Sequence, residues 1–238
     1  MTDVLVLTAI ELEARNLARE LELPQLSRFP FPVFEGSGGA VRVRVTPVGL
    51  RALLLAERWP SLAADLSSPL VISAGTCGAL APDLGVGDLV LPESVLGPAG
   101  ERSNVTPSAH AAAVKLAGGA RTGLLLTSAD AVGTPEAKAD LWRSTGAIAV
   151  DMESATVLAW ASHRGCPSLV VRAVSDTARQ HVPLELIGLV TREGKLRTGR
   201  AVALALTHPR TIPHALVLRR GTGRALKAVA RLIAALAG

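Results

Sequence analysis

The sequence predicts an α/β fold, a three-layer α/β/α sandwich in which helices cover both faces of a central mixed, mostly parallel sheet. Three observations lead to this prediction. The 238 residues are enough for one large α/β domain. Apolar runs of strand length alternate along the chain with segments of helical periodicity. Several of these runs are hydrophobic throughout, as in parallel strands that are covered on both sides.

The elements follow one another in a regular order. The run VLVLTAI (4–10) predicts a buried strand, and ELEARNLAREL (11–21) has the spacing of an amphipathic helix. In AVRVRVTPV (40–48) valines alternate with arginines, which predicts a strand with one face in water. Later strands are expected at 69–75, 87–95, 123–130 and 167–176, and later helices at 50–59, 134–146 and 152–165.

Composition narrows the class of protein. Hydrophobic residues make up 49% of the chain, which argues against disorder, and aromatic residues only 3%, which argues against a nucleic-acid binder that stacks bases. The two cysteines, Cys77 and Cys166, match neither a disulfide framework nor a metal site. The N-terminus lacks a basic leader and no apolar run reaches membrane-spanning length. We therefore expect a cytoplasmic protein without a bound metal.

The charge is concentrated near the C-terminus. Ten of the 25 Lys and Arg residues, but one of the 20 acidic residues, lie after position 190. We expect a single domain over 1–238 with a basic C-terminal extension at about 191–238. Within it, one helical stripe either packs on the sheet or rests, with its basic neighbours, on the inner membrane surface; the stripe consists of Leu226, Val229, Leu232, Ile233 and Leu236.

The segment SAGTCGALAP (73–82) carries glycines around two small side chains, at the end of a predicted strand. Gly75, Thr76, Cys77 and Gly78 would let the backbone approach a ligand and present its N–H groups, although such a segment also forms plain tight turns. The spacing is neither that of a P-loop nor that of a dinucleotide-binding fingerprint.

Two acidic clusters also stand out, one that interrupts an apolar run and one that ends a predicted strand. Asp151 and Glu153 lie two residues apart, which on a strand or turn places both on one side. Asp151 is suited to capping the next helix, and Glu153 to accepting two hydrogen bonds from the vicinal diol of a ribose. Asp176 ends the run VVRAVSD; a partly desolvated acid there either holds a proton for donation or caps a turn.

Taken together, the segments SAGTCGALAPDLGVGDLVLPE, AVDMESATVLAW and VVRAVSD resemble, in order and spacing, the nucleoside phosphorylase and methylthioadenosine/S-adenosylhomocysteine nucleosidase superfamily. The resemblance covers about residues 3–180. It implies a nucleoside phosphorylase-like fold, cleavage of the N-glycosidic bond of a purine nucleoside, and assembly as a homo-oligomer, either a dimer or a hexamer. Three motifs in the same order make the resemblance specific.

The resemblance also implies roles for individual residues. Asp176 matches the acid that protonates or hydrogen-bonds N7 of the departing purine, with Ser175 and Arg172 as neighbours that orient it. Glu13 matches the glutamate that activates the attacking water. The remaining candidates are substrate-binding: Glu153 and Met152 at the ribose, Thr76 with Gly75 and Cys77 beside the nucleophile, and Asp130 and Val132 near the base.

The sequence leaves the nucleophile open. Ser73 stands where the phosphorylase branch that shares GTCGA has an arginine, and the Gly-Asp-Pro phosphate loop is missing, which favours hydrolysis. Arg51, Arg28 or an arginine from a neighbouring subunit would be needed to hold inorganic phosphate as co-substrate; no other cofactor is expected. Asp-Met-Glu-Ser, TPEAK and the basic tail most resemble the hopanoid-associated phosphorylase branch, which implies adenosylhopane as substrate and adenine as product.

Two other functions compete with this hypothesis. A family member without chemistry would only bind a nucleoside, but Glu13, Glu153 and Asp176 are all present. A module that binds nucleic acid or a membrane surface through the basic tail is the other alternative. We expect a small-molecule enzyme that does not bind nucleic acid.

Overall fold

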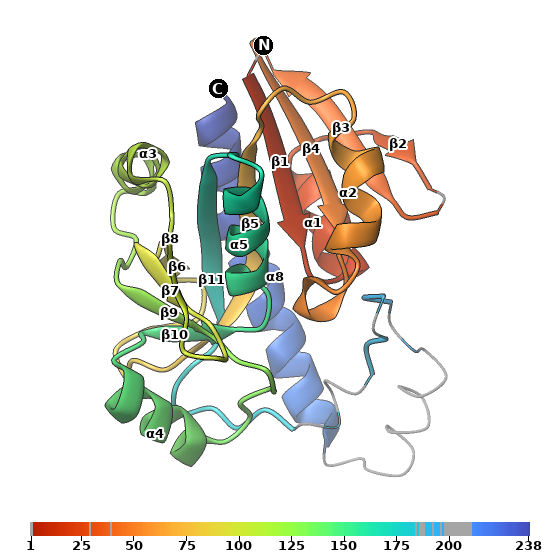
Figure 1. Ribbon diagram of the computed structural model, residues 1–238. Helices are drawn as coiled ribbons and strands as arrows, with labels where there is room; N and C mark the ends of the chain where they lie inside the picture. The colour runs from red at the N-terminus through yellow and green to blue at the C-terminus, as the bar shows by residue number, and fades with distance from the viewer. Residues whose placement is uncertain are drawn as a thin grey trace.

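A computed structural model shows the predicted α/β fold, with a central sheet between two layers of helices (Figure 1). Its sheet is mixed, and its central strands run mostly parallel, as expected. The structure describes residues 2–28, 30–38, 40–183, 185, 189–191, 193–195, 197 and 211–238.

The centre of the sheet is the long strand β5 (Leu70–Ala79). It pairs in parallel with β1 (Thr2–Thr8) on one side and β11 (Ser168–Asp176) on the other. Because all three strands end at the same edge of the sheet, the segments that follow them meet there. The other strands are β2 (Gln25–Ser27), β3 (Val33–Gly38), β4 (Val41–Pro47), β6 (Leu89–Val90), β7 (Ser94–Leu96), β8 (Arg102–Asn104), β9 (Leu124–Thr127) and β10 (Ala149–Asp151).

Alternation along β1 shows how the helices cover both faces. Val4 and Val6 belong to a core cluster with helices α1 (Glu11–Glu20) and α8 (Thr211–Ala237). Leu5 and Leu7 point the other way, into a cluster with α2 (Leu55–Ala63) and α5 (Ser154–His163). A strand that is apolar on both faces therefore lies between two helical layers, as the continuous run VLVLT predicted.

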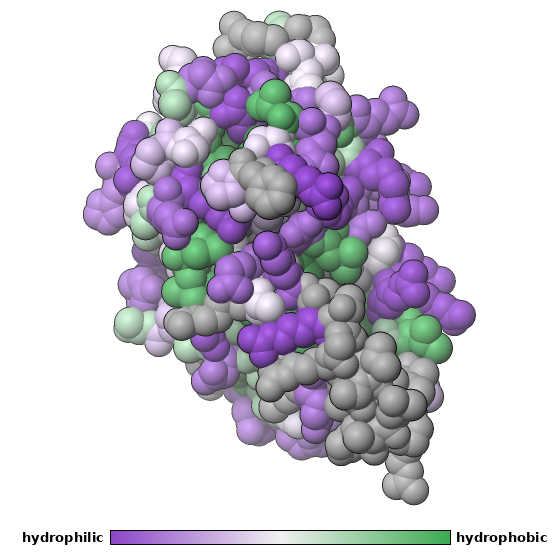
Figure 2. Space-filling view, turned by 90° about the vertical axis from the view of Figure 1, so that its right-hand side faces the viewer, coloured by the Kyte–Doolittle hydropathy of each residue, from purple (hydrophilic) through white to green (hydrophobic). Residues whose placement is uncertain are grey.

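The prediction that β4 has one face in water is wrong. Arg44 is only 4% exposed and pairs with Glu35 and Asp65. Arg42 is largely buried as well and binds Asp3 at 2.8 Å. Ion pairs with neighbouring segments thus take the place of water, which alternation alone does not reveal. Figure 2, seen from the side of β2 and β3, shows a mainly hydrophilic surface with separate hydrophobic groups.

Several boundaries differ from the prediction. The expected strand 87–95 is two short strands, β6 and β7, and the expected helix 50–59 is a 3-10 turn, η1 (Leu50–Ala52), followed by α2. Helix α3 (Pro107–Ala117) was not predicted, although a proline begins it and Gly118 ends it with a φ of 55°. Helix α4 (Pro135–Thr145) agrees with the prediction and ends at Gly146, which has a φ of 71°.

The apolar stripe of the C-terminal helix packs on the sheet. Leu226, Val229, Leu232 and Ile233 are at most 3% exposed and share a core cluster with β11 and β5. This was one of the two alternatives that the sequence left open. Part of the basic extension, at 198–210, lies outside the described residues. Within the described part, no helix is both long enough and apolar enough to cross a membrane.

Candidate active site

One cavity lies at the carboxyl ends of β1, β5, β10 and β11. Its volume is about 270 Å³, and Glu13, Glu153 and Asp176 all line it. These three acids come from the start of α1, the turn after β10 and the last residue of β11. Also in the lining are Thr76, Cys77, Asp130, Val132, Met152, Arg172 and Ser175, so the structure brings together every predicted site residue except Gly75.

Glu13 is 4% exposed and lies in the first turn of α1. One of its oxygens, Oε1, accepts the backbone N–H of Thr76 at 3.1 Å and the Thr76 hydroxyl at 3.2 Å. Burial raises the pKa of Glu13, and the charge of Arg172 only partly opposes this. A carboxylate with a raised pKa beside an open cavity is suited to taking a proton.

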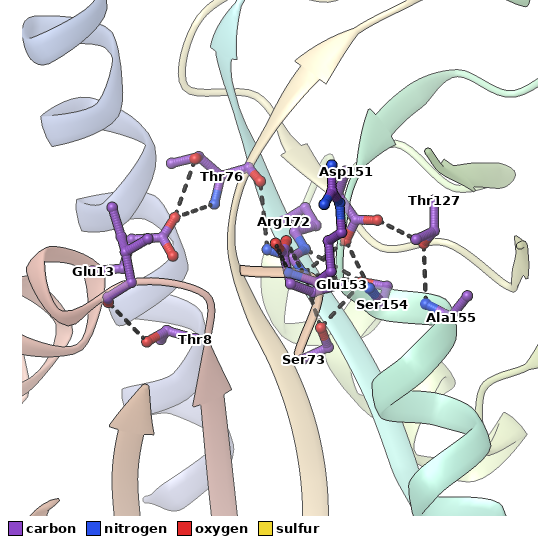
Figure 3. Close-up of polar contacts among 12 residues, drawn as sticks. Thr8, Glu13, Ser73, Thr76, Thr127, Asp151, Glu153, Ser154, Ala155 and Arg172 are labelled. Atoms are coloured by element: carbon purple, nitrogen blue, oxygen red, sulfur yellow. Dashed lines mark hydrogen bonds and ion pairs between the residues drawn. The ribbon is translucent and has the colours of Figure 1, made fainter. Parts of the chain in front are cut away.

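Arg172 lies between the carboxylates of Asp151 and Glu153 and holds both, as Figure 3 shows. Its guanidinium, which is 1% exposed, pairs with Asp151 at 2.7 Å and lies 3.8 Å from Glu153. The same nitrogen binds the hydroxyls of Ser73 and Ser154, at 2.9 and 3.1 Å. The expectation that Arg172 orients Asp176 is therefore corrected: Arg172 holds the Asp151–Glu153 side of the cavity.

Asp151 and Glu153 both face Arg172 but have different surroundings. Asp151 accepts the Thr127 hydroxyl at 2.7 Å and the N–H of Ser154 at 3.1 Å. It therefore satisfies the first N–H of α5, as the capping alternative expected, although Glu153 holds the N-cap position itself. The carboxylate of Glu153 accepts the N–H of Arg51 at 3.1 Å. Burial raises the pKa of Glu153 to about 7, with Arg172 acting in the opposite direction.

Asp176 is held from two sides. The Ser175 hydroxyl donates to its Oδ1 at 2.7 Å, as the prediction that Ser175 orients it required. The Lys138 ammonium lies 2.6 Å from its Oδ2, and the Lys138 side chain is 0% exposed. The sequence-based picture of an acid that holds a proton because it is desolvated is therefore incomplete. Asp176 forms a buried ion pair, and Lys138 was not among the predicted residues.

The two glycines of the strand end make room for acidic side chains. A Cβ on Gly75 would lie 2.7 Å from Arg172 Nη1 and 2.9 Å from Glu13 Oε1. A Cβ on Gly78 would lie 3.1 Å from Asp176 Oδ2. Gly75 was expected beside the ligand, but the structure places it behind Glu13 and Arg172. Its lack of a side chain serves the close packing of these charged groups.

Asp130 and Arg51 meet at the edge of the cavity. Asp130, whose side chain is 93% exposed, lies 3.3 Å from the guanidinium of Arg51. Arg51 also donates to the carbonyl of Ala129 at 2.7 Å and has a φ of 57°, a left-handed conformation that is unusual for a residue with a side chain. This conformation turns the Arg51 N–H toward Glu153, so the turn after β4 helps to fix that carboxylate.

Comparison with known families agrees with the arrangement of these motifs. The family model described as the Phosphorylase superfamily matches residues 3–207. The chain belongs to the phosphorylase superfamily. The superfamily predicted from the three motifs is therefore confirmed, and so is the enzyme class, cleavage of N-glycosidic bonds.

Known members of the superfamily are similar to this chain in sequence or in structure. A futalosine hydrolase of Streptomyces coelicolor is 31% identical over 231 residues, which cover 81% of this chain and 94% of that protein. The Helicobacter pylori 5′-methylthioadenosine/S-adenosylhomocysteine nucleosidase, solved as a mutant with 5′-methylthioadenosine in its active site, has a TM-score of 0.74 at 16% identity, with 99% and 98% of the chains covered. The Helicobacter pylori futalosine hydrolase has a TM-score of 0.71 at 17% identity, with 98% and 95% covered. These structures share the fold.

Lys138, which contacts the predicted acid Asp176, was not identified from the sequence. A signal was available: Lys138 stands three and four residues before Leu141 and Trp142, which pack into the core. Residues at this spacing share a helix face, so the lysine had to be buried with them. A buried lysine requires an acidic partner, and Asp176 is that partner.

Proposed function

We propose that this protein hydrolyses the N-ribosidic bond of a purine nucleoside that carries a substituent at its 5′ carbon. The observation that carries the proposal is that three carboxylates, from Glu13, Glu153 and Asp176, line one cavity at the carboxyl ends of neighbouring strands. Cleavage of this bond passes through a sugar with oxocarbenium character. Carboxylates around such a sugar stabilise its positive charge and exchange protons with the base and with water.

Each carboxylate has a distinct role in the proposal. Glu153 accepts hydrogen bonds from the ribose hydroxyls, with Met152 against the sugar. As the bond from C1′ to N9 breaks, its electron pair moves to the purine, and N7 takes up a proton from the side of Asp176. A water molecule then attacks C1′ and gives a proton to Glu13. The products are the free base and a ribose that keeps its 5′ substituent.

The charges in the cavity favour water over phosphate as the nucleophile. Of the lining residues that the structure describes, Arg172 is the one with a basic side chain, and it already pairs with Asp151 and Glu153. Ser73, at the position of the phosphorylase arginine, is buried beneath Arg172. A phosphate dianion beside Glu13 would meet a carboxylate without a free cation to offset the repulsion.

Futalosine is the first candidate substrate. The relative with 31% identity is a futalosine hydrolase, and the alignment covers almost all of that protein. The cavity also suits an apolar 5′ substituent, because one group of lining side chains is aliphatic and comes from four separate segments. This group consists of Ile10, Leu50, Val182, Val190 and Leu218.

Adenosylhopane is the second candidate, and one feature of α8 favours it. Leu218 lines the cavity, while its neighbours Leu216 and Val217 are 49% and 52% exposed, and Arg219 and Arg220 are exposed as well. A lipid tail that leaves the cavity there would meet apolar and basic side chains. The stripe farther along α8 is buried in the core, so contact with a membrane would involve this turn alone.

The test is base release from three nucleosides, futalosine, 5′-methylthioadenosine and adenosylhopane, each measured with and without inorganic phosphate. We expect turnover that does not depend on phosphate and a free 5′-substituted ribose as product. A ribose 1-phosphate product would overturn the assignment to hydrolysis. Tight binding of all three nucleosides without release of base would instead support the non-catalytic alternative.

A further inference from the structure

The buried contact between Lys138 and Asp176 goes beyond the roles proposed so far. Lys138 does not line the cavity, whereas Asp176 does, so the ammonium lies on the side of the carboxylate that faces away from the cavity. The three donors of the ammonium are all used: by Asp176 Oδ2 at 2.6 Å, by the carbonyl of Thr177 at 2.9 Å and by the carbonyl of Gln180 at 3.0 Å. The group is therefore fixed in position.

The position of Lys138 is unfavourable for stability alone. It is in the first turns of α4, where the helix dipole disfavours a cation, and its side chain is 0% exposed. Thr134 caps this helix by accepting the N–H of Ala137, so the start of the helix is well defined. Because a buried ion pair rarely stabilises a fold more than apolar residues of the same size would, a function for the pair is the better explanation.

We propose that Lys138 is a positioning residue that acts through Asp176 and supplies the proton that the purine takes up as it leaves. This inference rests on the proposed function. One proton moves from Nζ of Lys138 to the Asp176 carboxylate, and the resulting carboxyl group protonates N7 as the bond from C1′ to N9 breaks. Lys138 is left as an amine and Glu13 gains the proton from water. Exchange with solvent after product release restores both groups.

Two substrates that differ in the leaving purine distinguish proton supply by Lys138 from a purely structural role of this residue. Without Lys138, a purine that needs protonation leaves slowly, whereas a purine that is a good leaving group as an anion is affected less. A merely structural lysine would slow both to the same extent. Arginine keeps the positive charge but does not give up a proton in proteins, so Lys138→Arg distinguishes proton supply from charge.

The experiment compares two substrates, 5′-methylthioinosine and its 6-chloropurine counterpart, in the wild type, Lys138→Met and Lys138→Arg. For Lys138→Met we expect kcat on 5′-methylthioinosine to fall about 10²-fold or more, KM to stay within a few-fold, and the loss on the chloropurine to be at least about 10-fold smaller. Lys138→Arg should show the same pattern. Arg143→Met, which removes an exposed cation from the same helix, is the control and should behave like the wild type.

The outcomes distinguish this inference from the proposed function. If the wild type releases no base from either substrate, the proposed function fails. If the wild type is active but Lys138→Met loses equally on both substrates, or Lys138→Arg regains full activity, the proton supply by Lys138 is overturned. If Lys138→Met does not fold, the double variant Lys138→Met/Asp176→Asn is used, because it removes both buried charges. The ratio of its kcat values on the two substrates is compared with the same ratio for Asp176→Asn. The inference requires the two ratios to agree, and a difference between them overturns it.

Discussion

Glu13 and Thr76 join the start of α1 to the end of β5 through one carboxylate oxygen. Oε1 of Glu13 accepts both the N–H and the hydroxyl of Thr76, whereas Oε2 is buried and has no hydrogen-bond partner among the described residues. An unpartnered buried carboxylate oxygen is costly, so it marks a place for an external donor. In the proposed reaction that donor is the attacking water.

The first prediction concerns Glu13→Gln. The amide keeps the size of the side chain but accepts no proton, so we expect kcat for hydrolysis to fall about 10²- to 10⁴-fold while KM changes little. Steady-state kinetics of base release measures this. The variant should remain folded, since Oε1 can still accept from Thr76.

Glu11→Gln is the matched control for this change. Glu11 lies in the same helical turn, but its carboxylate is partly exposed and pairs with Arg15. It should keep wild-type kinetics. Equal losses in Glu11→Gln and Glu13→Gln would show that the effect comes from the helix and not from the buried carboxylate.

The second prediction is a pH dependence that belongs to Glu153. Since the pKa of Glu153 is about 7, its carboxylate is protonated below that pH and accepts fewer hydrogen bonds from a ribose. We expect kcat/KM to fall as the pH drops below about 7. Glu153→Gln should have low activity, and its kcat/KM should not fall with the titration of residue 153. Any fall in kcat/KM at low pH that remains in this variant should come from Glu13, whose pKa is also raised.

The third prediction follows from the same raised pKa and concerns stability. The folded-state pKa of Glu153 lies above its ordinary value of 4.5, so the folded protein binds more protons than the unfolded chain between these values. The contribution of Glu153 to the free energy of unfolding therefore increases as the pH falls from about 7 to 4.5. Above pH 7 the buried carboxylate is ionised and lowers the stability of the folded state. Glu153→Gln should raise the melting temperature at pH 8 and reduce its pH dependence; an exposed control, Glu57→Gln, should do neither.

These predictions depend on side chains whose positions the sequence revealed unevenly. The order of the main strands and helices, and the meeting of Glu13 and Asp176 at one edge, followed from apolar runs with polar ends, because parallel strands bring their carboxyl ends together. The place of Glu153 beside them rested on the resemblance to the superfamily. The partners of these acids did not follow. Arg172 lies in the continuous apolar run of β11, and the hydrophobic pattern of that run does not indicate whether the guanidinium contacts Asp176 or Asp151.

Ion pairs between distant segments escaped the sequence for the same reason. Arg44 looked like the wet face of β4 because nothing local shows that Asp65 lies against it. The spacing of Lys138 from Leu141 and Trp142 indicates a buried position on α4, but nothing local identifies Asp176 as its partner. Hydrophobic periodicity specifies the layers of the fold, whereas the pairing of buried charges is decided by tertiary contacts.

The fourth prediction concerns Asp176→Asn. The amide cannot deliver a proton in the same way, so we expect kcat to fall about 10²-fold or more on purine nucleosides. It also leaves the buried Lys138 ammonium without its carboxylate, so chemical denaturation should show lower stability. Asp83→Asn, which breaks an exposed pair with Arg121, is the control and should change neither quantity. Near-wild-type turnover in Asp176→Asn would remove Asp176 from the mechanism.

The last prediction tests whether Gly75 is needed for the charges behind the cavity. In Gly75→Ala the new Cβ would lie 2.7 Å from Arg172 Nη1 and 2.9 Å from Glu13 Oε1, closer than atoms of this kind approach. Both side chains are nearly fully buried and held by several hydrogen bonds, so neither can move without breaking them. We expect a loss of about 1–3 kcal/mol in the free energy of unfolding, together with lower kcat. Gly38→Ala is the control, because a Cβ there meets nothing within 4 Å, and it should match the wild type in urea unfolding. If Gly75→Ala unfolds like Gly38→Ala and keeps its turnover, the close packing of Glu13 and Arg172 against this glycine is not what positions the two charges.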